Sequence, residues 1–320
     1  MKKSFNKKIT VCLSSDDNYA LWMGCSIYSI LKNTGTNDVL NFYIFEDGIS
    51  AEHKRELESL VKNTVHKIHF ISVPFEKLPA LQINHAHLSR AAFARLLMGS
   101  LLPQEVDKVI YLDCDVMVCT SLSGLYGMDL KGDMVGAAED LGVERLRRLG
   151  SHPWNIENGP YTNSGVLLIN LAQWRKENIE RQILDYLQNP KYSLLFEDQD
   201  AINFVLAKRI KILDPRWNAQ MYWLEKDYNN YPPCYRQALE SPFIVHFAAR
   251  TKPWQWGSGW HKHTLQWRKY FKETGWKLES APPLWPLFKR VMWYWWRHPV
   301  CFLNPSFYNQ LKSRGRWLFY

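Results

Sequence analysis

The sequence has 320 residues, of which 46% are apolar and 22% charged, so it can bury a large core and is not generally disordered. Forty Lys and Arg against 31 Asp and Glu give a net charge of +9, which favours an anionic partner such as nucleic acid, lipid or glycan. Residues 250–320 hold 13 basic and 2 acidic residues and 10 of the 15 Trp, whereas residues 1–249 carry −2. We therefore expect a nearly neutral body and a basic, aromatic end.

The six cysteines are typical of a reduced, intracellular protein. None forms a Cys-x-x-Cys pair, and Cys12, Cys25 and Cys114 lie among apolar residues as free core thiols do. The apolar run Ile9–Leu13 is too short for a signal peptide. No window has the roughly 18 uninterrupted apolar residues of a membrane span. We expect a cytoplasmic location.

Apolar runs predict strands, and apolar residues at helical spacing predict helices. In chain order we expect a strand at Ile9–Leu13, a helix at Leu21–Leu31, a strand at Val39–Phe45, a helix from Ser50 to Val61, strands at Ile68–Val73 and Val109–Leu112, a strand at Val166–Ile169, helices at Leu171–Leu187 and Gln199–Leu206, and a strand at Phe243–Phe247. This order predicts an α/β fold with a mostly parallel sheet covered by helices. We expect one domain at residues 1–270, followed by an extension at 271–320.

Two acidic clusters are expected at the carboxyl ends of strands, where open α/β sheets bind their ligands. One is Ser14–Asn18, and the other is Asp113-Cys114-Asp115 after Val109–Leu112. Two carboxylates separated by one residue repel each other when they are partly desolvated, and Mg²⁺ or Mn²⁺ removes that cost. The alternative is a solvated turn with two chance acids, but the preceding apolar strand favours the metal site.

His246 lies within the apolar run Phe243–Phe247, which predicts a buried strand. It is either a hydrogen-bonded core histidine or the imidazole of a carboxylate–imidazole site that suits Mn²⁺. Arg250, Lys252 and Trp254 follow closely and form either a phosphate-binding loop or a basic surface turn.

Two further polar groups lie at predicted element ends. Asn163-Ser164-Gly165 precedes a strand and Asp198-Gln199-Asp200 opens a helix, so each is either part of a site or a cap. The chain has no Gly-rich phosphate loop, no Gly-x-Gly-x-x-Gly and no Gly-x-Ser-x-Gly, which argues against P-loop NTPases, dehydrogenases and serine hydrolases.

In this order and spacing, the segments resemble glycosyltransferase family 8, above all its bacterial lipooligosaccharide α-galactosyltransferases and lipopolysaccharide glucosyltransferases. The segments that carry the resemblance are Ser14–Tyr19, Phe93–Leu96, Val109–Asp115, Asn163–Asn170, Asp198–Asp200, His246 and Lys252–Trp254. The resemblance implies a GT-A fold that binds a nucleotide sugar. It also implies a Mn²⁺-dependent transfer, with Mg²⁺ as the alternative ion, of a hexose from UDP-galactose or UDP-glucose with retention of configuration.

By position, the resemblance implies roles for individual residues. The matched metal ligands are Asp113, Asp115 and His246, the matched catalytic residues near the donor hexose are Asp198 and Gln199, and the matched acceptor residues are Tyr19, His87 and Asp140. The matched nucleotide and donor-sugar contacts are Ser14, Asp16, Asp17, Asn18, Tyr19, Arg95, Asp113, Cys114, Asn163, Ala249 and Lys252.

The chain departs from the family in the loop after His246, where the family often has Gly and this chain has Ala249. Retention commonly uses a carboxylate nucleophile, but the matching residue is Gln199, a poor nucleophile. We expect Gln199 to position or stabilise, and Asp198 to stabilise an oxocarbenium-like charge. A front-face route, in which the leaving phosphate helps to deprotonate the acceptor, is the alternative to a covalent one.

The basic, Trp-rich end has three interpretations. Trp293, Trp295 and Trp296 lie among Lys and Arg, as in segments that anchor a protein to an anionic membrane surface. Binding of single-stranded nucleic acid by stacking is the second interpretation, but no RNA-binding motif supports it. Packing of the aromatic residues on the body is the third. We favour the anchor and expect no nucleic-acid partner.

The sequence thus predicts a cytoplasmic enzyme, peripherally attached to the inner membrane, that adds a hexose to a lipid-linked lipopolysaccharide or lipooligosaccharide acceptor. The alternatives are a family 8 enzyme that acts on another glycan or a protein, and a non-catalytic protein that binds a UDP-sugar or lipid. Both galactose and glucose are retained as the transferred sugar, and the resemblance alone favours galactose.

Overall fold

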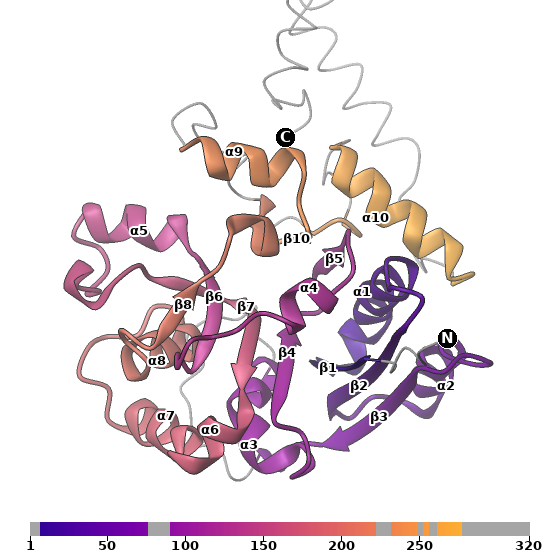
Figure 1. The fold of residues 1–320 in the computed structure, drawn as a ribbon, viewed down its shortest axis with the longest axis horizontal. Coiled ribbons are helices and arrows are strands. Elements are labelled where there is room, and N and C mark those ends of the chain that lie inside the picture. The colour runs from indigo at the N-terminus through magenta and orange to yellow at the C-terminus, as the bar shows by residue number, and fades with distance from the viewer. Residues whose placement is uncertain (1–6, 76–89, 222–231, 249–251, 256–260, 277–320) are drawn as a thin grey trace, which may run out of the picture.

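The computed structural model describes residues 7–75, 90–221, 232–248, 252–255 and 261–276. Its centre is a seven-stranded sheet in the order β3-β2-β1-β4-β7-β6-β8, accompanied by a three-stranded sheet in the order β5-β10-β9 (Figure 1). The strands are β1 (Lys7–Asp16), β2 (Asp38–Asp47), β3 (Lys67–Ser72), β4 (Lys108–Leu112), β5 (Val116–Val118), β6 (Val135–Glu139), β7 (Thr162–Asn170), β8 (Ile210–Ile212), β9 (Ala219–Gln220) and β10 (Ile244–His246).

The large sheet is mostly parallel, which confirms the predicted fold class. β1 runs parallel to β2 and β4, β2 to β3, and β6 to β8, whereas β7 is antiparallel to both β4 and β6. The helices are α1 (Ala20–Lys32), α2 (Ala51–Ser59), α3 (Met98–Leu101), α4 (Ser123–Tyr126), α5 (Leu141–Arg148), α6 (Leu171–Lys176), α7 (Ile179–Gln188), α8 (Glu197–Val205), α9 (Pro233–Glu240) and α10 (Lys262–Glu273). Among the residues described, no helix is long and apolar enough to cross a bilayer.

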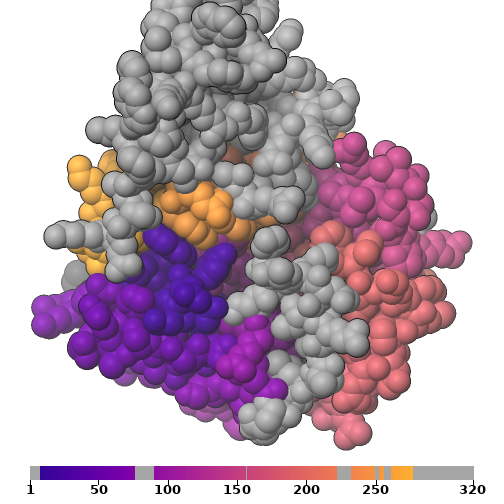
Figure 2. All heavy atoms as spheres, turned by 180° about the vertical axis from the view of Figure 1, so that it is seen from behind, coloured from indigo at the N-terminus to yellow at the C-terminus, as the bar shows by residue number. Residues whose placement is uncertain are grey.

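Side-chain alternation in the strands builds a core on each face of the sheet. Ile9, Val11 and Leu13 of β1 pack with α1, α2 and α4 on one face, whereas Cys12 packs on the other with η3 (Arg90–Leu97, a 3₁₀ helix), α6, α7 and α8. Residues 7–75 form one side of the molecule and α5–α8 the other (Figures 1 and 2). The sheet therefore lies between two cores, one on each face.

The reversal of β7 positions the site. Because β7 runs against β4, its first residues lie beside the last residues of β4: Leu112 pairs with Val166, and the Asp113 N–H donates to the Gly165 carbonyl at 2.9 Å. The polar residues Asn163 and Ser164 therefore face the end of β4.

Three boundaries drawn from the sequence are wrong. Ser14–Asp16 are not in a loop but continue β1, where they pair with Phe45–Asp47 of β2. Asn163–Gly165 lie inside β7 and do not precede it. The helix expected at 171–187 is two helices, α6 and α7, because Asn178 between them adopts the left-handed conformation at φ 52°.

The basic end of the chain starts as part of the body. Trp267 and Phe271 of α10 are buried against Cys25 of α1, Val245 and Phe247. The boundary expected after residue 270 falls inside α10, and packing on the body accounts for this first stretch of the aromatic end. Residues 277–320, which carry most of the proposed anchor, lie outside the described part of the chain.

We expect Trp267→Ala to lower the free energy of unfolding by about 3–5 kcal/mol, because it removes a fully buried aromatic side chain. Leu265→Ala, on the same helix but 41% exposed, serves as the control and should change it by less than about 0.5 kcal/mol. Urea unfolding measures both. Equal effects of the two variants would contradict the packing of α10 on the body.

Candidate functional site

The carboxyl ends of β1 and β4 meet at a small pocket. The two strands are direct neighbours, and the hydroxyls of Ser14 and Tyr111 lie 2.8 Å apart. The Cys114 thiol donates to the Ser14 carbonyl at 2.8 Å and joins the two strand ends. The pocket has a volume of about 160 Å³ and is lined by Ser14, Ser15, Asp16, Tyr19, Ala91, Ala92, Arg95, Tyr111, Asp113, Cys114, Asp115 and Lys252.

Asp113, Asp115 and His246 form an acidic cluster beside this pocket. Each offers one ligand atom, and these atoms lie within 4.8 Å of one another. His246 Nε2 is 3.3 Å from Asp115 Oδ1 and 3.7 Å from Asp113 Oδ2. The pairing of β5 with β10 brings His246 opposite Val116, directly after Asp115. Two carboxylate oxygens and an imidazole nitrogen suit Mn²⁺ or Mg²⁺.

Gly165 makes this close approach possible. A Cβ at Gly165 would lie 2.3 Å from His246 Cε1 and 2.6 Å from Asp113 Oδ2, distances that no side chain tolerates. Glycine is therefore required where β7 passes behind the cluster.

Lys252 neutralises part of the cluster's negative charge. Its Nζ lies 2.6 Å from Asp115 Oδ2 and donates to the Phe247 carbonyl at 2.8 Å. Burial by itself would raise the pKa of Asp115, but the ammonium group of Lys252 beside it holds that pKa well below its usual value. Asp115 is therefore an anion throughout the physiological pH range.

Arg95 bridges the acidic cluster to α8. Its Nη2 lies 2.8 Å from Asp113 Oδ1 and its Nε 3.1 Å from Asp198 Oδ2, while its Nη1 donates to the Ser164 carbonyl and hydroxyl, each at 3.0 Å. The Nε–H of Arg95 donates to the Ala92 carbonyl and not to Asp198. Asp198 Oδ2 is buried and accepts no hydrogen bond from the described residues. Burial raises the pKa of Asp198 to about 6, although Arg95 opposes the shift.

Gln199 is held at both ends of its amide. Its Oε1 accepts hydrogen bonds from Ser164 N at 3.0 Å and Asn163 Nδ2 at 3.1 Å, and its Nε2 donates to Asp140 Oδ2 at 3.2 Å. Asp140 also caps α5 by accepting from the Gly142 and Val143 N–H groups. The Gln199 side chain is therefore fixed beside the cluster.

Comparison with known proteins identifies the family. Residues 10–256 match the model of glycosyl transferase family 8. The chain belongs to glycosyltransferase family 8. It is 30% identical to general stress protein A of Bacillus subtilis over 89% of this chain and 99% of that protein. It is 29% identical to the lipopolysaccharide 1,2-glucosyltransferase of Escherichia coli over 75% of this chain and 71% of that one. The solved structure of the galactosyltransferase LgtC in complex with donor and acceptor sugar analogues has a TM-score of 0.68 and 26% identity, and the match covers 87% of this chain and 99% of LgtC.

This family membership makes the chain a glycosyltransferase, and the structural match confirms the expected GT-A fold. Most residues matched from the sequence lie together around the small pocket. Those that line the pocket are Ser14, Asp16, Tyr19, Arg95, Asp113, Cys114, Asp115 and Lys252. His246, Asp198, Gln199, Asn163 and Asp140 join them through the contacts given above.

Asp17 and Asn18 do not line the pocket. Asp17 Oδ1 instead lies 2.7 Å from His53 Nδ1 and accepts from the Ser50 N–H at 2.8 Å, which ties η1 (Asp17–Tyr19, a 3₁₀ helix) to α2. Asn18 is exposed. His87 and Ala249 lie outside the described residues.

Sequence reasoning named Ser164 only as part of a site or a cap, and it gave no role to two further polar residues that support the site, Tyr111 and Asn218. Ser164 and Tyr111 contact Arg95, and Asn218 lies 2.9 Å from His246 Nδ1. The hydroxyl of Tyr111 at the end of a buried strand was the one available signal, because a buried phenol needs a partner. Asn218 carries no local pattern.

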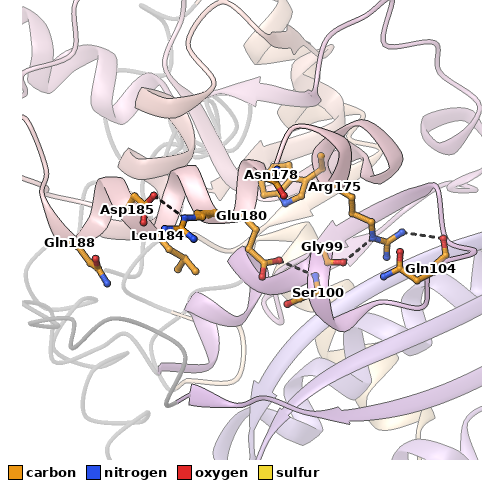
Figure 3. Close-up of a pocket in the computed structure, with 11 residues that line it drawn as sticks. Gly99, Ser100, Gln104, Arg175, Asn178, Glu180, Leu184, Asp185 and Gln188 are labelled. Carbon is orange, nitrogen blue, oxygen red and sulfur yellow. Dashed lines mark hydrogen bonds and ion pairs between the residues drawn. The ribbon is translucent and has the colours of Figure 1, made fainter.

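A second, larger cavity lies away from these residues. It has a volume of about 510 Å³ and lies between α3, α6 and α7 (Figure 3). Its charged side chains are paired: Glu180 accepts from the Ser100 N–H, Arg175 donates to the Gly99 carbonyl, and Arg181 pairs with Asp185. The residues matched from the sequence line the smaller pocket and not this cavity.

We expect Arg95→Leu to lower the free energy of unfolding by about 3–5 kcal/mol, because it leaves buried acidic groups without their cation. Arg90→Leu removes the same side chain from an exposed pair with Asp47 and should cost less than about 1 kcal/mol. Thermal and urea unfolding of both variants test the difference. Similar losses would contradict a structural role for the buried pair.

Proposed function

We propose that this protein transfers one hexose, galactose or glucose, from its UDP-sugar to the core oligosaccharide of a lipopolysaccharide or lipooligosaccharide with retention of configuration. The observation that carries the proposal is the cluster of Asp113, Asp115 and His246 at the rim of the pocket that contains Ser14, Asp16 and Lys252. Such a cluster is suited to a divalent cation, and the cation in turn to a nucleoside diphosphate, which brings a negative charge and oxygen ligands.

Asp113, Asp115 and His246 would hold Mn²⁺, with Mg²⁺ as the alternative, and the ion would act as a Lewis acid on the departing diphosphate. The donor set fits such an ion, and Gly165 keeps the space between Asp113 and His246 open. Lys252 and Arg95 add positive charge on the same side. In the proposal, Ser14, Asp16 and Tyr19 contact the nucleotide at the ends of β1 and η1.

Asp198 and Gln199 act on the donor hexose. The buried Asp198 Oδ2, which accepts no hydrogen bond from the described residues, supports contact with a sugar hydroxyl and stabilisation of the positive charge that develops on the ring. The Oε1 of Gln199 already accepts from Ser164 and Asn163. Gln199 therefore orients the neighbouring groups and does not attack the sugar, and the acceptor hydroxyl loses its proton to the leaving phosphate.

The acceptor approaches from the side of Tyr19 and Asp140, and its lipid brings the enzyme to the membrane. The Escherichia coli relative is named as a lipopolysaccharide glucosyltransferase, and LgtC as a galactosyltransferase, which supports a bacterial surface glycan as acceptor and leaves two hexoses as donors. We place the protein at the cytoplasmic face of the inner membrane, held by the basic, Trp-rich residues 277–320.

The site assignment is tested by a screen of UDP-sugars with Mn²⁺ that measures the UDP released. We expect release from UDP-galactose or UDP-glucose, its loss with EDTA, and a decrease of at least about 100-fold in Asp113→Asn because a metal ligand is removed. The control is Asp185→Asn, because the Asp185 side chain is 61% exposed and lines the larger cavity, not the pocket beside Asp113. Unchanged metal-dependent release by Asp113→Asn would reject the assignment, and no release from any UDP-sugar would favour a binding protein.

The anchor is tested in the full chain by replacing Trp293, Trp295 and Trp296 with Ala. We expect the wild type to float with vesicles that contain anionic lipid but not with neutral ones, and the triple variant to float several-fold less, because interfacial Trp and lipid charge act together. Replacing Tyr192, a 38% exposed aromatic residue of the body, with Ala is the control. Undiminished flotation of the triple variant would remove the anchor from the proposal.

A further inference from the structure

A chain of buried polar side chains connects Asp140 to His246. Asn163 Nδ2 donates to Asp140 Oδ2 at 3.2 Å, Asn218 Nδ2 donates to Asn163 Oδ1 at 2.8 Å, and Asn218 Oδ1 lies 2.9 Å from His246 Nδ1. Asn218 is completely buried and His246 is 3% exposed, so water does not compete for these bonds. A buried polar network of this kind is stable when each member is matched with a donor or acceptor.

The direction of this chain is fixed at both ends. The Asp140 carboxylate can only accept, so the amide of Asn163 must present its NH₂ group to it. The other end of that amide, Oδ1, then faces two donors, the Gly165 N–H at 3.0 Å and the NH₂ group of Asn218. Asn218 consequently turns its oxygen, and not its nitrogen, toward the imidazole.

An amide oxygen beside Nδ1 selects the imidazole tautomer that carries its proton there. The remaining ring nitrogen, Nε2, lies 3.3 Å and 3.7 Å from the two carboxylates, where its lone pair is available to an ion that they hold. A histidine binds a metal ion through such a lone pair, and the partner of its other nitrogen determines the tautomer and the ring orientation.

We propose that Asn218 is a positioning residue that fixes the tautomer of His246 so that Nε2 faces Asp113 and Asp115. The proposal rests on the metal site proposed above. Asn163 links this role to the donor-sugar side, because its NH₂ group also donates to Gln199 Oε1 at 3.1 Å. One network thus orients both the metal-facing imidazole and the Gln199 amide.

The test compares Asn218→Leu, which has a similar volume but no acceptor, with Asn218→Asp, which keeps an oxygen beside Nδ1. Electron paramagnetic resonance of free Mn²⁺ in the presence of UDP measures the affinity for the ion. We expect Asn218→Leu to bind Mn²⁺ about 10–100-fold more weakly than the wild type, and Asn218→Asp to stay within about threefold of it. Asn203→Leu, which removes another buried amide that does not touch His246, should also stay within about threefold.

A second measurement reads the tautomer in the metal-free protein. In ¹⁵N-histidine spectra we expect His246, identified by the signals lost in His246→Gln, to carry a proton on Nδ1 in the wild type and to lose it in part in Asn218→Leu, where only the carboxylates beside Nε2 still attract a ring proton. Unchanged Mn²⁺ affinity in Asn218→Leu, equal losses in the Leu and Asp variants, or an unchanged tautomer would each overturn the proposal. A wild type that binds no Mn²⁺ but has the Nδ1–H tautomer would instead overturn the metal site and leave the tautomer assignment standing.

Discussion

The central constraint in this protein is the negative charge gathered at the carboxyl end of β4. Asp113 and Asp115 lie on either side of Cys114, and Asp198 of α8 is on the far side of Arg95. Three carboxylates in a partly desolvated space repel one another strongly. The fold compensates with Arg95 and Lys252, which come from segments far apart in the sequence, and the geometry of the site follows from where these cations must lie.

The strand arrangement follows from the same constraint. β7 has to run against β4 for Ser164 to accept from Arg95, and Gly165 has to lack a side chain for His246 to approach Asp113. The small β5-β10-β9 sheet then supplies His246 from the opposite side. The charge that remains after this compensation is negative, and a divalent cation held by Asp113, Asp115 and His246 would neutralise it.

Local sequence patterns were sufficient for some of these features and insufficient for others. Asp113 and Asp115 could be predicted because an apolar strand directly precedes them. Asp16 and Asp17 are adjacent and chemically identical, and only the pairing of β1 with β2 and the position of His53 decide that Asp16 lines the pocket while Asp17 ties η1 to α2. Asn218 could not be found at all, because its importance comes from Asn163 and His246, which are 55 and 28 residues away in the sequence.

The basic residues behind the net charge of +9 do not all belong to one tail with one role. The first part of the basic end serves the catalytic body: Lys252 pairs with Asp115, and Arg268 Nε donates to the Pro253 carbonyl at 3.2 Å. Trp254 stacks on Trp22 of α1 with ring centroids 5.1 Å apart. The ring centroid of Trp267 in α10 lies 5.5 Å from that of Trp254. α10 therefore packs against residues 253 and 254, which directly follow Lys252. In the proposal above, a surface that binds anionic lipid would begin only after α10, and it would use other cations than Lys252 and Arg95, which lie beside the proposed metal site.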